Sequence, residues 1–103
     1  MNKKDLIARE ILGWKARSKN SWYDVEKEVF VHESYFLPEK YIDQAMLIVN
    51  KLDMWGVTYS TNGVSEVQFD DVTGTGDTLA EAITNAAYFL IEKFAMIENR
   101  YYN

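Results

Sequence analysis

The sequence contains no cysteine and only one histidine among its 103 residues. Without cysteine, disulfide bonds and metal sites built from thiolates are excluded. The single histidine, His32, has no nucleophile and orienting acid beside it in a recognisable pattern, so no hydrolytic triad is indicated. No apolar run approaches the roughly 20 residues of a membrane span. Charges at Asp5, Arg9 and Glu10 also interrupt the first apolar segment, unlike a secretory signal. We expect a soluble, cytoplasmic protein.

The apolar content is nevertheless high, at 48% with 15% aromatic residues. That content suffices for one packed core, and a chain of this length has no room for a second. We therefore expect a single domain over residues 1–103.

The charge is unevenly distributed along the chain. Residues 1–20 carry a net charge of +4, whereas the remaining residues carry −9, for a total of −5. An acidic body repels the phosphates of double-stranded nucleic acid, so we consider such a partner unfavourable. The basic segment at the start remains able to attract an anion locally.

Helical spacing of apolar residues predicts three helices. The first covers residues 3–14, and the second follows Pro38, runs from Ile42 to Leu52 and is ended by Gly56. The third begins at Leu79 and continues to about Asn99, a length of roughly 30 Å. Between the first two helices, the polar stretch 15–21 is predicted as a loop. Alternation across 23–31 predicts one half-buried strand.

Residues 57–69 have the pattern of a β-hairpin around Asn62-Gly63. A two-residue turn would place apolar side chains opposite polar ones, so we favour a three-residue loop, residues 62–64. This register pairs Val57 with Phe69 and Tyr59 with Val67. The fold predicted from all these elements is α+β, with three helices packed on a small, mainly antiparallel sheet of three or four strands.

The string "DVTGTGD", residues 71–77, resembles the glycine-rich signature of ribokinase-like sugar kinases. That resemblance implies an anion hole at Gly74–Gly76, with Asp77 as the base that deprotonates the acceptor hydroxyl. It covers only seven residues, and 103 residues cannot supply the large sheet and pockets of such a kinase. A structural interpretation explains the same residues: Thr78 and Glu81 form a capping box at a helix start. Phosphotransfer therefore remains a remote alternative.

The aspartates of this loop raise the question of a metal site. Asp70, Asp71 and Asp77 lack the alternating spacing and distal glutamate of a calcium loop. We predict no metal ion, no cofactor and no catalytic residue.

A second candidate site combines Trp14 and Trp22 with Lys15, Arg17 and Lys19. Cations interleaved with aromatic residues are typical of sites for single-stranded nucleic acid or nucleotides. The alternative is that both tryptophans simply anchor a loop on the core. Together with Gly74 and Gly76, these residues form the predicted site for a ligand or a partner.

Aromatic residues also broaden the apolar stripe of the third helix. Tyr88, Phe89, Tyr101 and Tyr102 exceed what one sheet can cover, and exposed aromatic residues often mark interfaces. We predict a homo-oligomer that uses this surface.

Four motifs, in order along the chain, resemble the phage ABA-sandwich domain family. They are "EILGW" (10–14), "WYD" (22–24), "YFLPEKYIDQA" (35–45) and "DTLAEAITNAA" (77–87), and the similarity extends over roughly residues 6–92. The resemblance implies an α–β–α arrangement and a small phage or prophage protein in the cytoplasm of a bacterial host. It supplies no catalytic residues.

The function expected on this basis is non-enzymatic. An accessory protein of this kind would bind a host or phage protein, and inhibition of host defence is the role suggested by analogy. The alternative is a protein that binds or sequesters a nucleotide or another small anion.

Overall fold

The computed structural model describes the backbone of residues 2–102 and the side chains of residues 2–95. In chain order the helices are α1 (Lys3–Glu10), the short 3-10 helix η1 (Glu33–Tyr35), α2 (Ile42–Met54) and α3 (Leu79–Tyr102). The strands are β1 (Lys15–Ser18), β2 (Ser21–Asp24), β3 (Val29–His32), β4 (Tyr59–Asn62), β5 (Glu66–Phe69) and β6 (Val72–Thr75).

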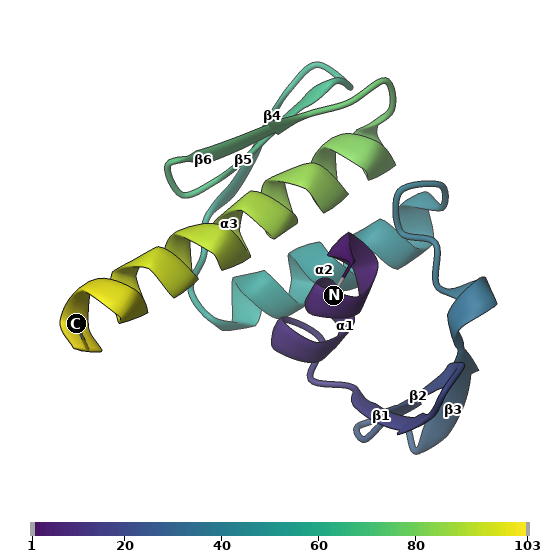
Figure 1. Cartoon of the computed structure of the whole chain (residues 1–103). Helices are drawn as coiled ribbons and strands as arrows, with labels where there is room; N and C mark the ends of the chain where they lie inside the picture. Colours follow the sequence, from purple (N-terminus) through teal and green to yellow (C-terminus); the bar gives the residue numbers. More distant parts are fainter. Residues whose placement is uncertain (1, 103) are drawn as a thin grey trace.

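The strands form two separate antiparallel sheets, with the orders β1-β2-β3 and β4-β5-β6. Figure 1 shows the helices between them: the second sheet covers one side of α3, while α1 and α2 lie on its other side. The first sheet lies beyond α1, at the opposite end of the molecule from the second. The predicted α+β class is confirmed, but the strands are divided between two sheets instead of one.

The centre of the core is α3, which is covered from both sides. Most of its buried side chains are small, and the buried positions are Ala80, Ala82, Ile83, Thr84, Ala86, Ala87 and Leu90. Alanine permits close approach of the sheet on one side and of α2 on the other. Even the buried Thr84 is satisfied, because its hydroxyl donates to the Ala80 carbonyl at 2.9 Å.

The first sheet was only partly predicted. The polar stretch expected to be a loop contains β1, whose four residues are all exposed and so carry no apolar alternation. The single strand expected over 23–31 is two strands, β2 and β3, joined by a turn in which Glu28 has a φ of 56°. The break in alternation at Lys27 marked this turn.

The second sheet has the predicted faces in a shifted register. Tyr59 pairs with Phe69 and Thr61 with Val67, so the expected pairing of Tyr59 with Val67 is wrong by two residues. The loop still has three residues, now 63–65, and Gly63 has the expected positive φ of 68°. A shift of two keeps every side chain on its face, and it places the aromatic rings of Tyr59 and Phe69 5.6 Å apart.

The helix boundaries follow their caps. α1 ends four residues earlier than expected, and Gly13, with a φ of 73°, turns the chain toward β1. α2 begins at Ile42 as expected, and Pro38 lies in the turn that precedes the helix. Gly56, with a φ of 84°, follows the end of α2 as expected. None of the described helices is both long and apolar enough to cross a membrane.

Candidate functional site

The glycine-rich segment 71–77 forms β6 and the entry to α3. Gly74 is buried under α3, and a Cβ atom there would lie 2.3 Å from the backbone nitrogen of Ala86. A Cβ on Gly76 would lie 2.8 Å from both the Ala82 nitrogen and the Glu81 Cβ. The space that a side chain would occupy at either glycine is therefore taken by α3, so both glycines serve strand-to-helix packing.

The start of α3 satisfies several of its own backbone donors. The Glu81 amide donates to the Thr78 hydroxyl at 3.2 Å, as the predicted capping box requires. The Glu81 carboxylate reaches the Asp77 amide at 3.4 Å, one residue before the expected one. The Gly76 amide is held by the Ser65 carbonyl at 3.0 Å. These amides are therefore engaged within the protein.

A shallow polar depression lies beside this turn, lined by Asn62, Ser65, Glu66, Thr75, Gly76, Asp77 and Glu81. Three of these residues are carboxylates and none is basic. Asp77, the base implied by the kinase resemblance, is exposed here. The negative charge of the depression disfavours a phosphate, whose binding needs compensating positive charge.

The remaining aspartates of the loop have separate structural roles. Asp70 accepts from the Thr58 amide at 2.9 Å and from its hydroxyl at 3.0 Å, tying the β5–β6 turn to the start of the hairpin. Asp71 pairs with Lys93 of α3, and the hydrogen bond and charge of that lysine lower the pKa of Asp71. Asp77 lies beyond the far end of β6. Within the described residues, no group of three or more histidine or acidic side chains could hold a metal ion.

The two tryptophans of the second predicted site are core residues. Trp14 and Trp22 are 7% and 8% exposed. The ring of Trp14 packs against Phe36, with centroids 4.8 Å apart. Neither tryptophan offers a free ring face for stacking, so the structure separates them from the cations beside them in sequence.

Lys15, Arg17 and Lys19 are all exposed. Lys15 lies opposite Tyr23 on β2, and Tyr23 lies opposite Phe30 on β3. The guanidinium of Arg17 lies over the Tyr23 ring, 5.5 Å from its centroid. The cations therefore meet these two aromatic residues instead of the tryptophans.

We call the solvent side of this sheet the outer face; its residues are Lys15, Arg17, Ser18, Ser21, Tyr23, Phe30 and His32. Phe30 is 69% exposed. The next residue of the strand, Val31, and its cross-strand partner Trp22 point to the other side of the sheet and pack on the core. Sequence reasoning missed Tyr23 and Phe30 as a pair because the turn between β2 and β3 was not recognised.

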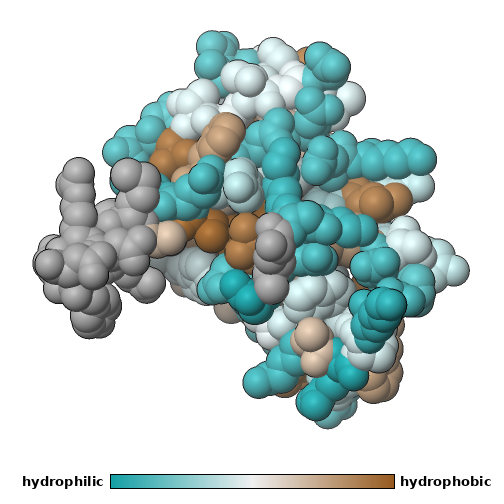
Figure 2. Space-filling model, viewed as in Figure 1, coloured by the Kyte–Doolittle hydropathy of each residue, from teal (hydrophilic) through white to brown (hydrophobic). Residues whose placement is uncertain are grey.

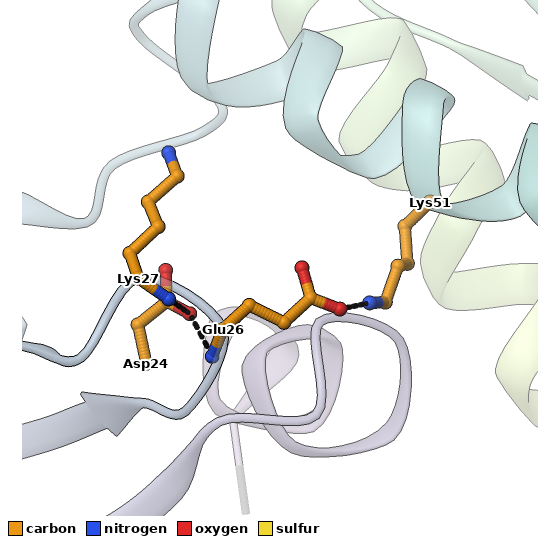
Figure 3. Close-up of polar contacts among 4 residues, drawn as sticks. All are labelled: Asp24, Glu26, Lys27 and Lys51. Atoms are coloured by element: carbon orange, nitrogen blue, oxygen red, sulfur yellow. Dashed lines mark hydrogen bonds and ion pairs between the residues drawn. The ribbon is translucent and has the colours of Figure 1, made fainter.

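Asp24, on the inner side of β2, holds the turn that brings Tyr23 and Phe30 together. Its carboxylate accepts from the amides of Glu26 and Lys27 at 3.1 and 3.2 Å. Figure 3 shows these bonds and the ion pair that Glu26 forms with Lys51 of α2. The turn is thus fixed at both ends, to β2 and to α2.

A second surface feature is an apolar groove of about 320 Å³ between α1, the end of α2 and the second half of α3. It is lined by Leu6, Arg9, Glu10, Ile11, Leu52, Trp55, Leu90, Ile91, Phe94 and Ala95, and we call it the helical groove. Figure 2 shows apolar surface exposed in the middle of this side of the molecule, between the helices. Sequence periodicity could place its residues on apolar stripes but not reveal that the three stripes leave a gap.

The aromatic residues proposed for self-association are divided. Tyr88 is half-buried, with the Lys3 ammonium over its ring at 5.8 Å, and Phe89 is 46% exposed beside it. The side chains of Tyr101 and Tyr102 lie outside the described residues.

Comparison with protein families gives one match over most of the chain. The family model for the phage ABA sandwich domain matches residues 5–88. The chain belongs to this family. Comparisons with curated proteins and with solved structures gave no significant match.

The structure explains the phage ABA sandwich motifs of this chain by packing. Trp14 and Phe36 come from two separate motifs and contact each other in the core. In the "WYD" motif, Trp22 enters the core and Asp24 holds a turn. The motifs therefore maintain the fold, while the residues exposed between them are free to carry function.

Proposed function

We propose that this phage ABA sandwich protein is an accessory protein that acts without catalysis, by binding a host or phage protein. The observation that supports this most is the helical groove, an apolar channel bounded by three helices. Phe94, at 43% exposed, and Trp55, at 50%, stand at its side and end. Large apolar and aromatic side chains around an apolar depression are typical of protein–protein contacts.

The shape and chemistry of the groove suit one kind of occupant, an amphipathic helix. Its walls are the apolar sides of α1 and α3, and its rim carries the ion pair of Arg9 and Glu10, whose nitrogen and oxygen are 2.9 Å apart. A helix laid along the groove would place its apolar stripe on Ile91 and Phe94 and its polar side toward the rim.

The test is co-purification from phage-infected cells with a tagged protein, followed by reconstitution with the purified captured protein. Phe94→Ser and Trp55→Ser should abolish the complex, because each removes a large anchor from the groove. Phe30→Ser, a matched change of an exposed aromatic residue outside the groove, should preserve it. If the parent and all three variants captured the partner equally, the assignment of the groove as the binding site would be contradicted.

Inhibition of a host defence protein is the role we propose for such a contact. Expression of the protein in defended cells should raise the plating efficiency of a sensitive phage, and Phe94→Ser should remove that gain. No change in plating efficiency across defence systems would count against this role, while leaving the protein–protein contact itself to the co-purification test.

Self-association of the chain is a second candidate use of α3. Phe89 is 46% exposed beside the half-buried Tyr88, and exposed aromatic residues favour burial in an interface. In that arrangement a second copy covers the helix and contributes to one continuous partner-binding surface.

A further inference from the structure

We propose that the outer face of the first sheet is a binding surface for single-stranded nucleic acid. Bases stack on the exposed ring of Phe30, which the Tyr23 ring flanks on the neighbouring strand, and the cations of β1 and its turn hold the phosphates. This surface is separate from the helical groove, and the inference does not rest on the proposed protein partner.

The stacking surface is built across the strands. Tyr23 and Phe30 are direct cross-strand partners, with ring centroids 5.0 Å apart. Phe30 is 69% exposed. Among the described aromatic contacts, its ring meets only the ring of Tyr23. An exposed ring on a flat sheet is the platform on which single-stranded bases stack in sheet-based nucleic-acid-binding domains.

The platform continues along β3. His32 is exposed two residues after Phe30, and its ring lies 6.2 Å from the ring of Tyr35, which is 73% exposed. The Ser34 amide donates to Nδ1 of His32 at 3.2 Å, so the imidazole is held in place by the chain. The rings of Phe30 and His32 therefore lie on β3, and the ring of Tyr35 follows them in η1, just beyond the sheet.

Positive charge lies along β1, at the other edge of the same face. Lys15, Arg17 and Lys19 belong to β1 and the turn after it, and none has an ion-pair partner among the described residues. Arg17 stacks on Tyr23, which leaves the edge of its guanidinium free for a phosphate. Cations beside aromatic rings match the alternating phosphates and bases of a single strand.

The nearby carboxylates are directed elsewhere or lie at the margin. Asp24 is buried on the inner side, and Glu26 is paired with Lys51 of α2. Glu28 lies in the turn and Glu33 in η1, outside the three strands. The outer face is thus locally basic on an acidic protein, which favours a flexible single strand that contacts this face alone over a duplex that also approaches the acidic body.

An acidic protein would also be attracted by these cations, but it would have no use for the stacked rings. The exposed aromatic row is what favours a nucleic acid. The sheet is three strands wide and four residues long, roughly 10 by 13 Å, which is room for two or three stacked bases.

Fluorescence anisotropy with labelled oligothymidylate and oligouridylate of about 15 nucleotides tests the proposal. We expect binding of at least one of them, with the two arms separating DNA from RNA. A duplex of the same length and a polyglutamate peptide should bind at least tenfold more weakly. The slope of log K against log salt should be about −2, as three phosphate contacts imply.

Phe30→Ala should weaken binding by about 5- to 150-fold, the effect of losing one base stack. The matched control Val64→Ala truncates an apolar side chain that is exposed to the same 69% in the β4–β5 loop, and it should leave the affinity unchanged. Arg17→Gln should reduce the steepness of the salt dependence by about 0.7, whereas Lys40→Gln, near α2, should not alter it. Both Phe30 and Arg17 are exposed, so circular dichroism should show that these variants fold.

Three outcomes would overturn the proposal. One is absence of binding to either oligonucleotide at low salt. Another is equal affinity for the duplex or for polyglutamate, which would show that the face responds to charge alone. The third is binding that Phe30→Ala does not weaken, since base stacking would then play no part.

Discussion

Gly74 illustrates how one residue can carry a motif without carrying chemistry. Its hydrogen side chain allows β6 to lie directly on the backbone of α3, where Ala86 fills the remaining space. A kinase-like string and a close-packed crossing require the same small residues, so the sequence alone could not distinguish them. The structure distinguishes them because the glycine is buried under the helix.

Replacement of Gly74 by alanine should destabilise the protein strongly. The new methyl group would lie 2.3 Å from the Ala86 nitrogen, so β6 and α3 must move apart. Overpacking of this kind costs about 1–3 kcal/mol or more, to be measured by urea unfolding. Thr73→Ala, on the exposed side of the same strand, is the control and should cost well under 1 kcal/mol, or roughly the scale of surface changes. A Gly74→Ala protein as stable as the parent would refute this packing.

The ion pair of Asp71 and Lys93 predicts that the stability of the folded protein depends on pH. Lys93 holds the pKa of Asp71 below its ordinary value of 3.8, so the folded state binds this proton more weakly than the unfolded state. The resulting stability is fully present above pH 3.8 and is lost as the pH falls through the folded-state pKa. Because the pair is exposed and screened by solvent, the effect is small.

Thermal unfolding of Asp71→Asn across the acid range checks this. The melting temperature of the variant should lie slightly below that of the parent at neutral pH, and the two should converge in acid. Lys93→Gln, which removes the partner and leaves the carboxyl, should show the same convergence. A difference that persists unchanged in acid would mean that the pair does not contribute.

At the scale of elements, the sequence predicted best where apolar periodicity was unbroken. The stripes of α2 and α3 and the faces of the β4–β5 hairpin were found because burial imposes a period on the residues. β1 was missed because a fully exposed strand has no such period. β6 was missed because glycine and threonine at a close crossing read as a turn.

The candidate surfaces show the same limit. Composition identifies Lys15, Arg17 and Lys19, but the sequence predicts their neighbours Trp14 and Trp22 as aromatic partners. Only the strand pairing brings Tyr23 and Phe30 to the cations. The pairing of β2 with β3 depends on the turn that the buried carboxylate of Asp24 organises. A single aspartate leaves no periodic pattern in the sequence.

Asp24→Ala should therefore disrupt the β2–β3 turn. The change leaves the amides of Glu26 and Lys27 without their acceptor, at a cost of about 1–3 kcal/mol. Urea unfolding followed by tryptophan fluorescence suits the measurement, because Trp22 is two residues away. Asp24→Asn keeps one acceptor oxygen and should lose less, so equal losses in both variants would argue against this role.

At the scale of the whole molecule, α3 joins the second sheet to α1 and α2. It contacts the second sheet on one side and α1 and α2 on the other, and then continues as a helix to Tyr102 (Figure 1). Its buried described side chains end at Leu90. The family match also ends near this point, at residue 88. The described burial thus assigns folding to α3 up to Leu90, while self-association through exposed residues of the same helix stays a prediction.

A shortened chain that ends at Ala95 separates folding from self-association. It retains every buried side chain of the described part of α3, so its melting temperature should stay close to that of the full chain. If Tyr101 and Tyr102 contribute to the oligomer, light scattering should give a larger mass for the full chain than for the shortened one. A monomeric full chain would refute the predicted homo-oligomer, and an unfolded shortened chain would refute the assignment of the core.

The sheet order β1-β2-β3 has a consequence for aggregation. β1 pairs on one side only, so its other side offers free N–H and C=O groups to any strand that approaches. The charges of Lys15 and Arg17 on this sheet edge repel a second copy of the same strand, as gatekeeper residues do. Neutralising them weakens that protection, so an Arg17→Gln protein should form fibrillar aggregates sooner than the parent under shaking.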